Sequence, residues 1–306
     1  MKGIVVIDKP TGRTSFDVVR EVRGLLGTRK AGHTGTLDPL ASGVLPVCVG
    51  EATKLVPFLT DDDKEYVVTA RFGVETDTFD GEGTVLAIRP VDFGEEDLRE
   101  ALPAFRGTQA QVPPRYSAVK VQGRPLHRWA RKGVTLDPPA RTVTVYRFDL
   151  LRFEAPFGTF FIHCAKGTYV RSLCSDLGRK LGCGAAVVAL RRTRSGRFGE
   201  RDALSLQGLG TEGKRALLER NVISLERALG HMPSLVVDEE TEKRIRNGRP
   251  PTEESLKKQV LPFLEKGNLI QFLSEESRVV AIGKIEGPPC EKRAGESAIR
   301  IVRVFR

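Results

Sequence analysis

Alternating hydrophobic and polar residues predict a mixed α+β chain that begins with a strand. Residues 3–8 are mostly apolar, and residues 9–12 after them have the composition of a turn. From Thr14 onward the apolar residues recur every three or four positions, which is the period of an amphipathic helix. Asp17 follows Thr14 at the spacing of a capping box, and Gly27 ends the helix.

The same patterns predict the rest of a sheet and the helices that cover it. Strand patterns occupy residues 44–49, 64–73, 84–88, 141–153, 158–164 and 185–190, and helix patterns occupy residues 52–59, 95–105 and 170–181. Segments 141–153 and 158–164 are near enough in sequence to pair as antiparallel neighbours. We therefore expect a mixed, mostly antiparallel central sheet flanked by helices.

The last third of the chain has a different organisation. Residues 200–230 are polar with a helical pattern and close a first domain, and a boundary follows near residues 231–233. Beyond it lie a capped helix at 238–247 and strand patterns at 269–273, 279–285 and 298–305, whose spacing predicts a small β-barrel. We therefore expect one domain at 1–230 and a second at 231–306.

Positive charge is concentrated in two stretches. The chain has 49 Lys and Arg against 39 Asp and Glu, a net charge of +10. Residues 115–147 hold eight basic residues against one acid, and residues 166–201 hold nine against two. Tyr116, Trp129 and Tyr169 lie among these cations, a combination that suits a phosphate backbone and unstacked bases. A solvated polar face is the alternative for either stretch alone, but two of them favour a nucleic-acid partner.

The composition argues against several other classes of protein. No run of eighteen apolar residues is present, so we expect no membrane-spanning helix. The five cysteines include no C-x-x-C pair, and no Walker A loop or Rossmann fingerprint occurs, so we expect neither a metal nor a cofactor. No signal-peptide pattern precedes the first strand, which predicts a cytoplasmic protein.

The most informative segment for chemistry is residues 32–45, where three glycines and a proline exclude regular structure before an apolar run. Asp38 is its only carboxylate, and Pro39 biases Asp38 toward an extended backbone. A short acid on a stiffened loop, with glycines that allow close approach, suits a nucleophile or a general base. The alternative is that Asp38 only caps a turn, as Asp before Pro commonly does.

This loop resembles the catalytic motif of the TruB family of pseudouridine synthases, which act on position 55 of tRNA. The motif reads G-H-x-G-x-L-D-P-x-A-x-G-x-L, and every fixed position is present here. Further segments that resemble family motifs are residues 8–15, 64–66, 111–120 and 166–171. The resemblance therefore extends over most of the chain.

The resemblance implies roles for three catalytic residues. Asp38 would be the nucleophile, Tyr66 would stack on the target base and is a candidate to remove its C5 proton, and Arg171 would pair with Asp38. A guanidinium beside a buried carboxylate favours its ionised, nucleophilic form. From the residues alone, a core aromatic is the preferred interpretation of Tyr66, and the alternative for Arg171 is an exposed helix residue. The sequence leaves open whether Asp38 attacks C1′ or C6 or assists formation of a glycal.

The resemblance also implies residues that bind the substrate or support the site. His33 would fill the space that the flipped base leaves, Tyr169 would contact the nucleotide and Leu190 would line the uracil pocket. Lys9 and Pro10 would support the catalytic loop. Without the resemblance, His33 is a structural histidine, Leu190 a packing residue and Lys9 a surface turn residue.

The family's fold and partner complete these expectations. The resemblance implies the pseudouridine synthase fold, a PUA-like RNA-binding domain at the C-terminus, and an insertion at about 112–141 that clamps the T-arm of tRNA. The candidate contacts to the RNA backbone are Lys120, Arg128, Arg131, Lys132, Arg191 and Arg192. We expect a monomer with no obligatory protein partner. The alternatives are a guide-RNA-dependent synthase of the dyskerin type and a non-catalytic tRNA-binding or tRNA-folding protein.

Overall fold

A nine-stranded sheet is the centre of the computed structural model, which describes residues 2–117, 119–121, 123–126, 129, 134, 136, 138–252, 265–287 and 298–305. Its strands follow the order β1-β3-β12-β4-β11-β10-β7, while β2 pairs with β3 and β13 with β12. The bounds are β1 Gly3–Lys9, β2 Ala31–His33, β3 Ala41–Val49, β4 Lys64–Phe72, β7 Gly107–Gln111, β10 Arg141–Glu154, β11 Phe157–Cys164, β12 Ala185–Ser195 and β13 Phe198–Gly199. Of the strand pairs described in this sheet only β12–β3 is parallel, so the expected mixed, mostly antiparallel sheet is confirmed.

The first helix, α1 Ser15–Leu25, forms where its period predicted it. Thr14 accepts from the backbone N–H of Asp17 at 3.1 Å, and the Asp17 carboxylate accepts from the N–H of Thr14 at 3.2 Å, which completes the expected capping box. Val18 and Val22 on its apolar face are buried against the sheet, because a helix with this period presents one hydrophobic side. Because the helix is anchored on the sheet, it fixes the position of residues 26–31, which lead into the catalytic loop at residues 32–45.

The middle of the sheet joins strands from distant parts of the sequence. In β4, Val68, Ala70 and Phe72 are buried on one face, as the alternation predicted. Strand β12 is longer than the expected 185–190, because it pairs with β4 along its length and with β3 near the catalytic loop. In this register Leu190 lies between Ala41 of β3 and Val68 of β4.

The structure also contains the other predicted helices, with changes in some of their bounds. The predicted helix at 170–181 is α5 Val170–Lys180, which packs on β12. The predicted helix at 95–105 is divided into α3 Glu95–Ala101 and the 3-10 turn η2 Leu102–Phe105. The segment 52–59 likewise becomes η1 Gly50–Leu55 followed by α2 Val56–Thr60. The remaining elements of this part are β5 Val74–Thr76 paired with β6 Val85–Ile88, β8 Lys120–Val121 paired with β9 Arg124–Pro125, and η3 Glu200–Asp202.

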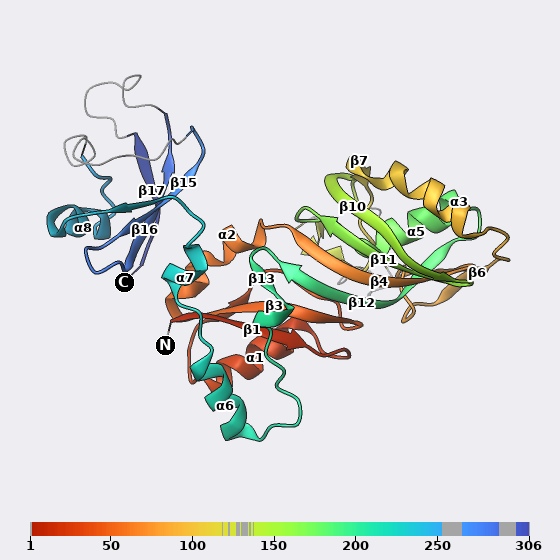
Figure 1. Ribbon diagram of the computed structural model, residues 1–306, viewed down its shortest axis with the longest axis horizontal. Helices are drawn as coiled ribbons and strands as arrows, with labels where there is room; N and C mark the ends of the chain where they lie inside the picture. The colour runs from red at the N-terminus through yellow and green to blue at the C-terminus, as the bar shows by residue number, and fades with distance from the viewer. Residues whose placement is uncertain are drawn as a thin grey trace.

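The C-terminal part forms a second, smaller sheet (Figure 1). After α6 Thr211–Arg220 and α7 Leu225–Leu229 come β14 Ser234–Val236, α8 Glu239–Arg246, β15 Leu269–Leu273, β16 Val279–Ile285 and β17 Ile299–Val304. The four strands lie in the order β14-β15-β16-β17, and among the described residues the two edge strands do not pair. The expected closed β-barrel is therefore not seen in the described part of the chain, which shows an open sheet. The division at residues 230 and 231 stays a prediction.

Apolar packing joins the two sheets. Phe305 is buried in one cluster with Ile4 of β1 and Leu55 of η1. Lys54 adds a polar contact by donating from Nζ to the carbonyl of Val304 at 2.9 Å. The end of the chain thus packs against the strand that begins it.

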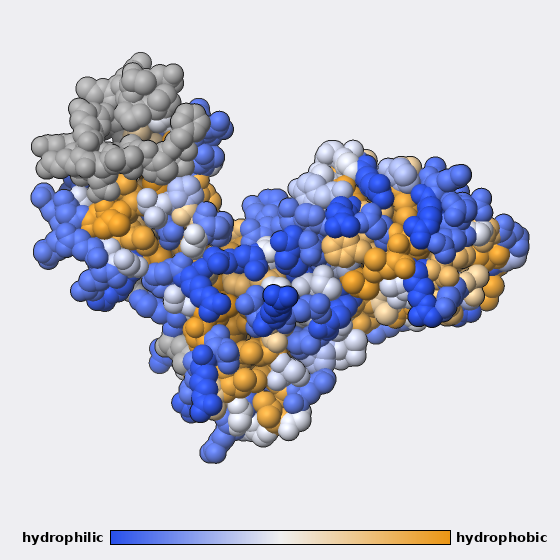
Figure 2. All heavy atoms as spheres, viewed as in Figure 1, coloured by the Kyte–Doolittle hydropathy of each residue, from blue (hydrophilic) through white to orange (hydrophobic). Residues whose placement is uncertain are grey.

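On the face in Figure 2, polar residues surround several apolar patches. The most exposed large apolar side chain that the structure describes is Ile88 of β6, at 77%. In the described part of the chain, no helix is long and apolar enough to cross a membrane.

Candidate active site

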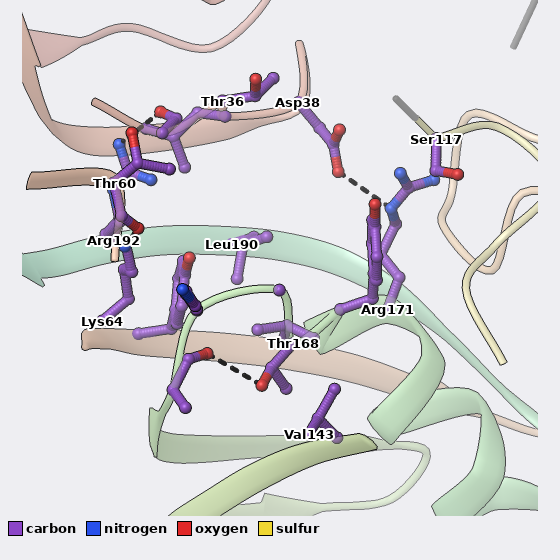
Figure 3. A pocket seen from close by; sticks show the side chains of 18 of the residues that line it. Thr36, Asp38, Thr60, Lys64, Ser117, Val143, Thr168, Arg171, Leu190 and Arg192 are labelled. Carbon is purple, nitrogen blue, oxygen red and sulfur yellow. Dashed lines mark hydrogen bonds and ion pairs between the residues drawn. The ribbon is translucent and has the colours of Figure 1, made fainter. Parts of the chain in front are cut away.

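A cavity of about 530 Å³ opens beside the catalytic loop (Figure 3). Its wall includes Asp38 from the loop, Tyr66 from β4, Tyr169 and Arg171 from the start of α5, and Leu190 from β12. The volume is typical of a site for one small ligand or one nucleotide unit. The fold therefore brings five of the predicted site residues, from four separate segments, to one cavity.

Two buried side chains fix the backbone on either side of Asp38. Ser15, at the start of α1, donates from Oγ to the carbonyl of Leu37 at 3.0 Å and accepts from the N–H of Leu37 at 2.8 Å. Lys9 is fully buried, and its Nζ donates to the carbonyls of Arg13 at 2.6 Å and Pro39 at 3.4 Å. The alternative of a surface turn residue is therefore wrong for Lys9, which is buried and bonds to the loop at Pro39.

Gly43, at the end of the loop, is a position that only glycine fits. Its φ is +102°, and an added Cβ would lie 2.2 Å from the carbonyl oxygen of Arg192 on the parallel neighbour β12. A residue with a side chain would be strained and would clash with backbone. The glycine thus lets the loop join the sheet directly beside Leu190 and its neighbours.

Arg171 contacts Asp38, and the alternative of an exposed helix residue is wrong. The Arg171 side chain is buried, and its Nε lies 2.9 Å from Oδ2 of Asp38. Its Nη1 donates to the carboxylate of Asp80 at 3.0 Å and to the carbonyl of Thr78 at 2.9 Å, and Nη2 donates to the carbonyl of Tyr116 at 3.0 Å. These partners hold the planar guanidinium in one orientation, so its edge toward Asp38 is fixed.

Asp80 is a site residue that the sequence analysis missed. Its buried carboxylate accepts from Arg171, from Thr78 Oγ1 at 2.6 Å and from the N–H of Glu82 at 3.1 Å. In the sequence Asp80 precedes Gly81, and this pair indicates only a turn. No sequence pattern connects Asp80 to α5, the helix that carries Arg171 and begins much later in the chain.

Burial raises the pKa of Asp38 above its ordinary value, and the charge of Asp80 adds to this rise, while Arg171 and Lys9 oppose it. Arg171 favours the ionised carboxylate, as expected, but desolvation outweighs the ion pair, so the net shift of the Asp38 pKa is upward. The Asp38 side chain still exposes 34% of its surface to the cavity. A carboxylate that is fixed, partly desolvated and open to a ligand is suited to nucleophilic attack.

Tyr66 and Tyr169 contribute aromatic rings to the cavity wall. Burial raises the pKa of Tyr66 to about 12, so its phenol is protonated at neutral pH. Burial also raises the pKa of Tyr169, whose backbone exchanges two hydrogen bonds with the side chain of Gln111, at 2.8 and 3.1 Å. Both rings are therefore uncharged at neutral pH, which suits stacking on a base.

His33 lies beside the cavity wall and not in it. Its Nδ1 accepts from the N–H of Gly35 at 3.3 Å, so this nitrogen is unprotonated. Burial and the charge of Arg192 lower the pKa of His33, which keeps the ring neutral. Its predicted contact with RNA stays a prediction.

The chain matches known families over most of its length. The model of the TruB family pseudouridylate synthase N-terminal domain matches residues 23–170, and that of the tRNA pseudouridylate synthase B C-terminal domain matches residues 171–230. The tRNA pseudouridine synthase B of Syntrophus aciditrophicus is 47% identical over 100% of this chain and 99% of that protein. The chain belongs to the TruB family of pseudouridine synthases. A relative of the same name in Pseudomonas aeruginosa is 44% identical over 93% of this chain and 92% of that protein.

Solved structures share the fold of this TruB-family chain. A chain of a Cbf5-Nop10-Gar1 complex is 27% identical, with a TM-score of 0.72 over 99% of this chain and 85% of that one. The archaeal box H/ACA sRNP Nop10-Cbf5 complex gives 26% identity and a TM-score of 0.73, over 99% of this chain and 86% of that one. The mixed fold with a mostly antiparallel central sheet is therefore the pseudouridine synthase fold.

The basic residues that the TruB resemblance assigned to the RNA backbone divide into three groups. Arg192 is fully buried and lines the cavity instead of the outer surface, and its predicted contact with the RNA backbone stays a prediction. Arg191 lies at the surface but forms ion pairs with Asp8 at 3.0 Å and Glu200 at 2.6 Å. The side chain of Lys120 and residues 128, 131 and 132 lie outside the described residues.

Proposed function

We propose that this TruB-family chain isomerises uridine 55 in the T-loop of tRNA to pseudouridine, with Asp38 as the nucleophile. The observation that carries the proposal is the contact between Asp38 and the buried Arg171, in a cavity lined by Tyr66. The curated relatives in Syntrophus aciditrophicus and Pseudomonas aeruginosa are both named tRNA pseudouridine synthase B, which supports tRNA as the substrate.

The reaction detaches uracil from C1′, rotates it and rejoins it through C5. A stacked base cannot reach a carboxylate inside a cavity, so the target nucleotide must flip out at a cost of about a few kcal/mol. Stacking on Tyr66 returns roughly 1–3 kcal/mol per base. Because the phenol of Tyr66 is protonated, it serves as a stacking surface and does not act as a preformed phenolate base.

Each remaining residue has a positioning or recognition role in this proposal. Lys9, with Pro10 beside it, holds the catalytic loop, and Leu190 and Tyr169 form the walls that accept the base. His33 enters the space that the base vacates. The arm at about 112–141 clamps the T-arm through Lys120, Arg128, Arg131 and Lys132.

The open sheet β14-β15-β16-β17 is assigned to a PUA-like RNA-binding domain at 231–306, next to a catalytic domain at 1–230. Its position after the catalytic sheet and the exposed cation Arg303 on its edge strand support this assignment, while Arg300 on the same strand pairs with Glu286 at 2.7 Å. We further propose that the enzyme acts as a monomer in the cytoplasm, without an obligatory protein partner.

The structural likeness to Cbf5, which is solved in complexes with Nop10 and Gar1, keeps a guide-RNA-dependent enzyme as the second candidate. The higher sequence identity to the curated relatives, 47% against 27%, favours the enzyme that acts alone. The two candidates differ in one requirement, because only the second needs added RNA and protein to modify a free tRNA.

Pseudouridine mapping on an unmodified tRNA, with the purified chain alone, tests the proposal. We expect product at position 55, no product with Asp38→Asn, and normal activity with Asp77→Asn, which lies in a surface turn. A tRNA with cytidine at position 55 controls for the site. No product from the wild-type chain, with tRNA still bound, would refute the stand-alone enzyme and favour the guided or tRNA-folding alternatives.

A further inference from the structure

Lys64 and Arg192 are two cations in the cavity wall that no described carboxylate neutralises at close range. Arg192 is fully buried and Lys64 is 7% exposed, and both line the cavity that contains Asp38. Among the described residues neither lies within ion-pair distance of an acid, whereas Arg194, on the same strand, pairs with Glu65 at 2.5 Å. The two acids that attract Lys64, Asp61 and Asp62, do so from longer range.

Backbone carbonyls hold both cations in fixed positions. Arg192 donates from Nε to the carbonyl of Val44 at 2.8 Å and from Nη2 to that of Gly35 at 3.1 Å. Its remaining nitrogen, Nη1, is buried and has no acceptor among the described residues. Lys64 donates from Nζ to the carbonyl of Thr60 at 2.6 Å. Both side chains pack under the catalytic loop, since a Cβ on Gly35 would lie 3.4 Å from Nη1 of Arg192 and 3.7 Å from Cε of Lys64.

The charges buried around the loop do not balance. The buried cations that the structure describes there are Lys9, Lys64, Arg171 and Arg192. Of the acids beside them, Asp80 is buried and Asp38 is half-buried, and both contact Arg171. Burying an uncompensated charge is expensive, because the charge loses its hydration and gains no partner. A surplus of positive charge fixed in a cavity therefore indicates that negative charge arrives with the ligand.

The place of Lys64 and Arg192 in the cavity indicates which part of a bound RNA this positive charge would face. In Figure 3, Lys64 and Arg192 lie at one end of the cavity and the Asp38–Arg171 pair lies at the other, with Leu190 between them. Arg192 is also directly opposite Tyr66 in the pairing of β12 with β4. Phosphodiester groups stay at the mouth, since the strand must enter and leave there, so the base is the part that reaches the far end.

We propose that Lys64 and Arg192 form an electropositive wall that stabilises the negative charge developing on uracil during isomerisation. This inference rests on the proposed function and adds an electrostatic element to the same site. Fixed charges in a dry cavity stabilise a developing anion strongly, because they need not reorganise when it forms.

The chemistry of the step requires such an anion. When Asp38 attacks C1′, a C1′–O bond forms and the C1′–N1 bond breaks, and its electron pair remains on the base, shared by N1, O2 and O4. After rotation C5 attacks C1′ and Asp38 leaves, C5 releases its proton and N1 takes one up, so atoms and electrons balance without a co-reactant. Attack at C6 would also place charge on O4. The wall would therefore stabilise negative charge on the base whether Asp38 attacks C1′ or C6.

Single-turnover measurements on T-arm RNA with Lys64→Met and Arg192→Gln test the wall. We expect each variant to slow cleavage of the N-glycosidic bond by about 10²-fold, the effect of removing one preorganised donor from an anion site. The dissociation constant of the RNA should stay nearly unchanged, and Arg192→Lys, which keeps the charge, should recover part of the rate. Arg194→Gln, which removes a paired charge from the same strand, is the control and should react normally.

A second substrate distinguishes a loss of electrostatic stabilisation from a change in the shape of the site. Fluorine at C5 withdraws electrons and stabilises the uracil anion, so the slowing should be clearly smaller on RNA that carries 5-fluorouridine at the target position. Equal slowing on both substrates would show that the residues only shape the site, and unchanged rates in the variants would refute the wall outright. If Arg192→Gln does not fold, Arg192→Lys and Lys64→Arg are compared on the same two substrates. A wild-type chain that cleaves neither substrate would instead refute the proposed function.

Discussion

The link from Asp80 through Arg171 to Asp38 can be tested by the single change Asp80→Asn. The Asp80 carboxylate is buried and accepts from Nη1 of Arg171 at 3.0 Å, while its other oxygen accepts from Thr78 Oγ1 and the N–H of Glu82. The asparagine side chain keeps the shape and one acceptor oxygen, and places an NH₂ group against the guanidinium. The donor then faces a donor, so Arg171 loses one partner and the fixed orientation that this partner provides.

The size of the effect follows from the contact that is lost. A hydrogen bond to a charged group contributes about 1.5–3 kcal/mol. If all of this free energy is lost from the stabilisation of the transition state, the rate falls by about 10- to 150-fold, since about 1.4 kcal/mol corresponds to a factor of ten. The loss stays below that of Asp38→Asn because Arg171 keeps its bonds to the carbonyls of Thr78 and Tyr116.

The assay is single-turnover pseudouridine formation, with tRNA affinity and thermal midpoint measured alongside. The matched control is Asp77→Asn in the same turn, because Asp77 accepts from the N–H of Thr84 and does not contact Arg171. A second signature is the pH profile. The charge of Asp80 raises the pKa of Asp38, so its removal should move the acid limb to lower pH. A wild-type rate in Asp80→Asn, or equal slowing in Asp77→Asn, would refute the reasoning.

Four further predictions follow from other parts of the fold. Because burial raises the pKa of Asp38 and the ionised form reacts, the wild-type rate should fall as pH drops through a pKa above that of an ordinary aspartate, and an acid limb at the ordinary value would contradict this. Burial lowers the pKa of Lys9 to about 8, so the rate should also decline above pH 8 as the support of the loop loses its charge, whereas Lys9→Arg should remove that basic limb. Thr14→Ala removes the capping box of α1 and should cost about 1 kcal/mol in urea unfolding, with Thr28→Ala as a neutral control. Phe305→Ala should cost about 3–5 kcal/mol by opening the cluster between the two sheets, and an unchanged unfolding midpoint would show that the sheets are independent.

Local pattern predicted most of the elements. The alternation in β4, the period of α1 and its capping box, and the apolar face of α5 are all present at the predicted residues. These features depend on neighbours a few residues apart, so the sequence contains the whole signal. The pattern was less accurate for β12, whose extension beyond residue 190 depends on pairing with β3 and β4.

The candidate site was predicted in part, and the resemblance to the TruB family carried that part. Residue type and spacing alone left Arg171 as readily exposed as catalytic, and the structure buries it between two carboxylates. Asp80 was missed because its sequence context indicates a turn. The resemblance placed Arg192 near a phosphate, and only the fold shows that this side chain is buried in the cavity wall.

The sequence by itself determined most of the secondary structure, the catalytic loop with its single acid and the family to which the chain belongs. These properties are encoded in short segments, where steric preference and hydrophobic period act locally. Only the tertiary structure decided which charges are desolvated and which of them meet. The pairing of β12 with β3 and β4 places Arg192 under the loop, and the packing of α5 places Arg171 between Asp38 and Asp80. Burial and charge proximity depend on residues far apart in the chain, and for this reason the direction of the pKa of Asp38 could not be read before the fold was known.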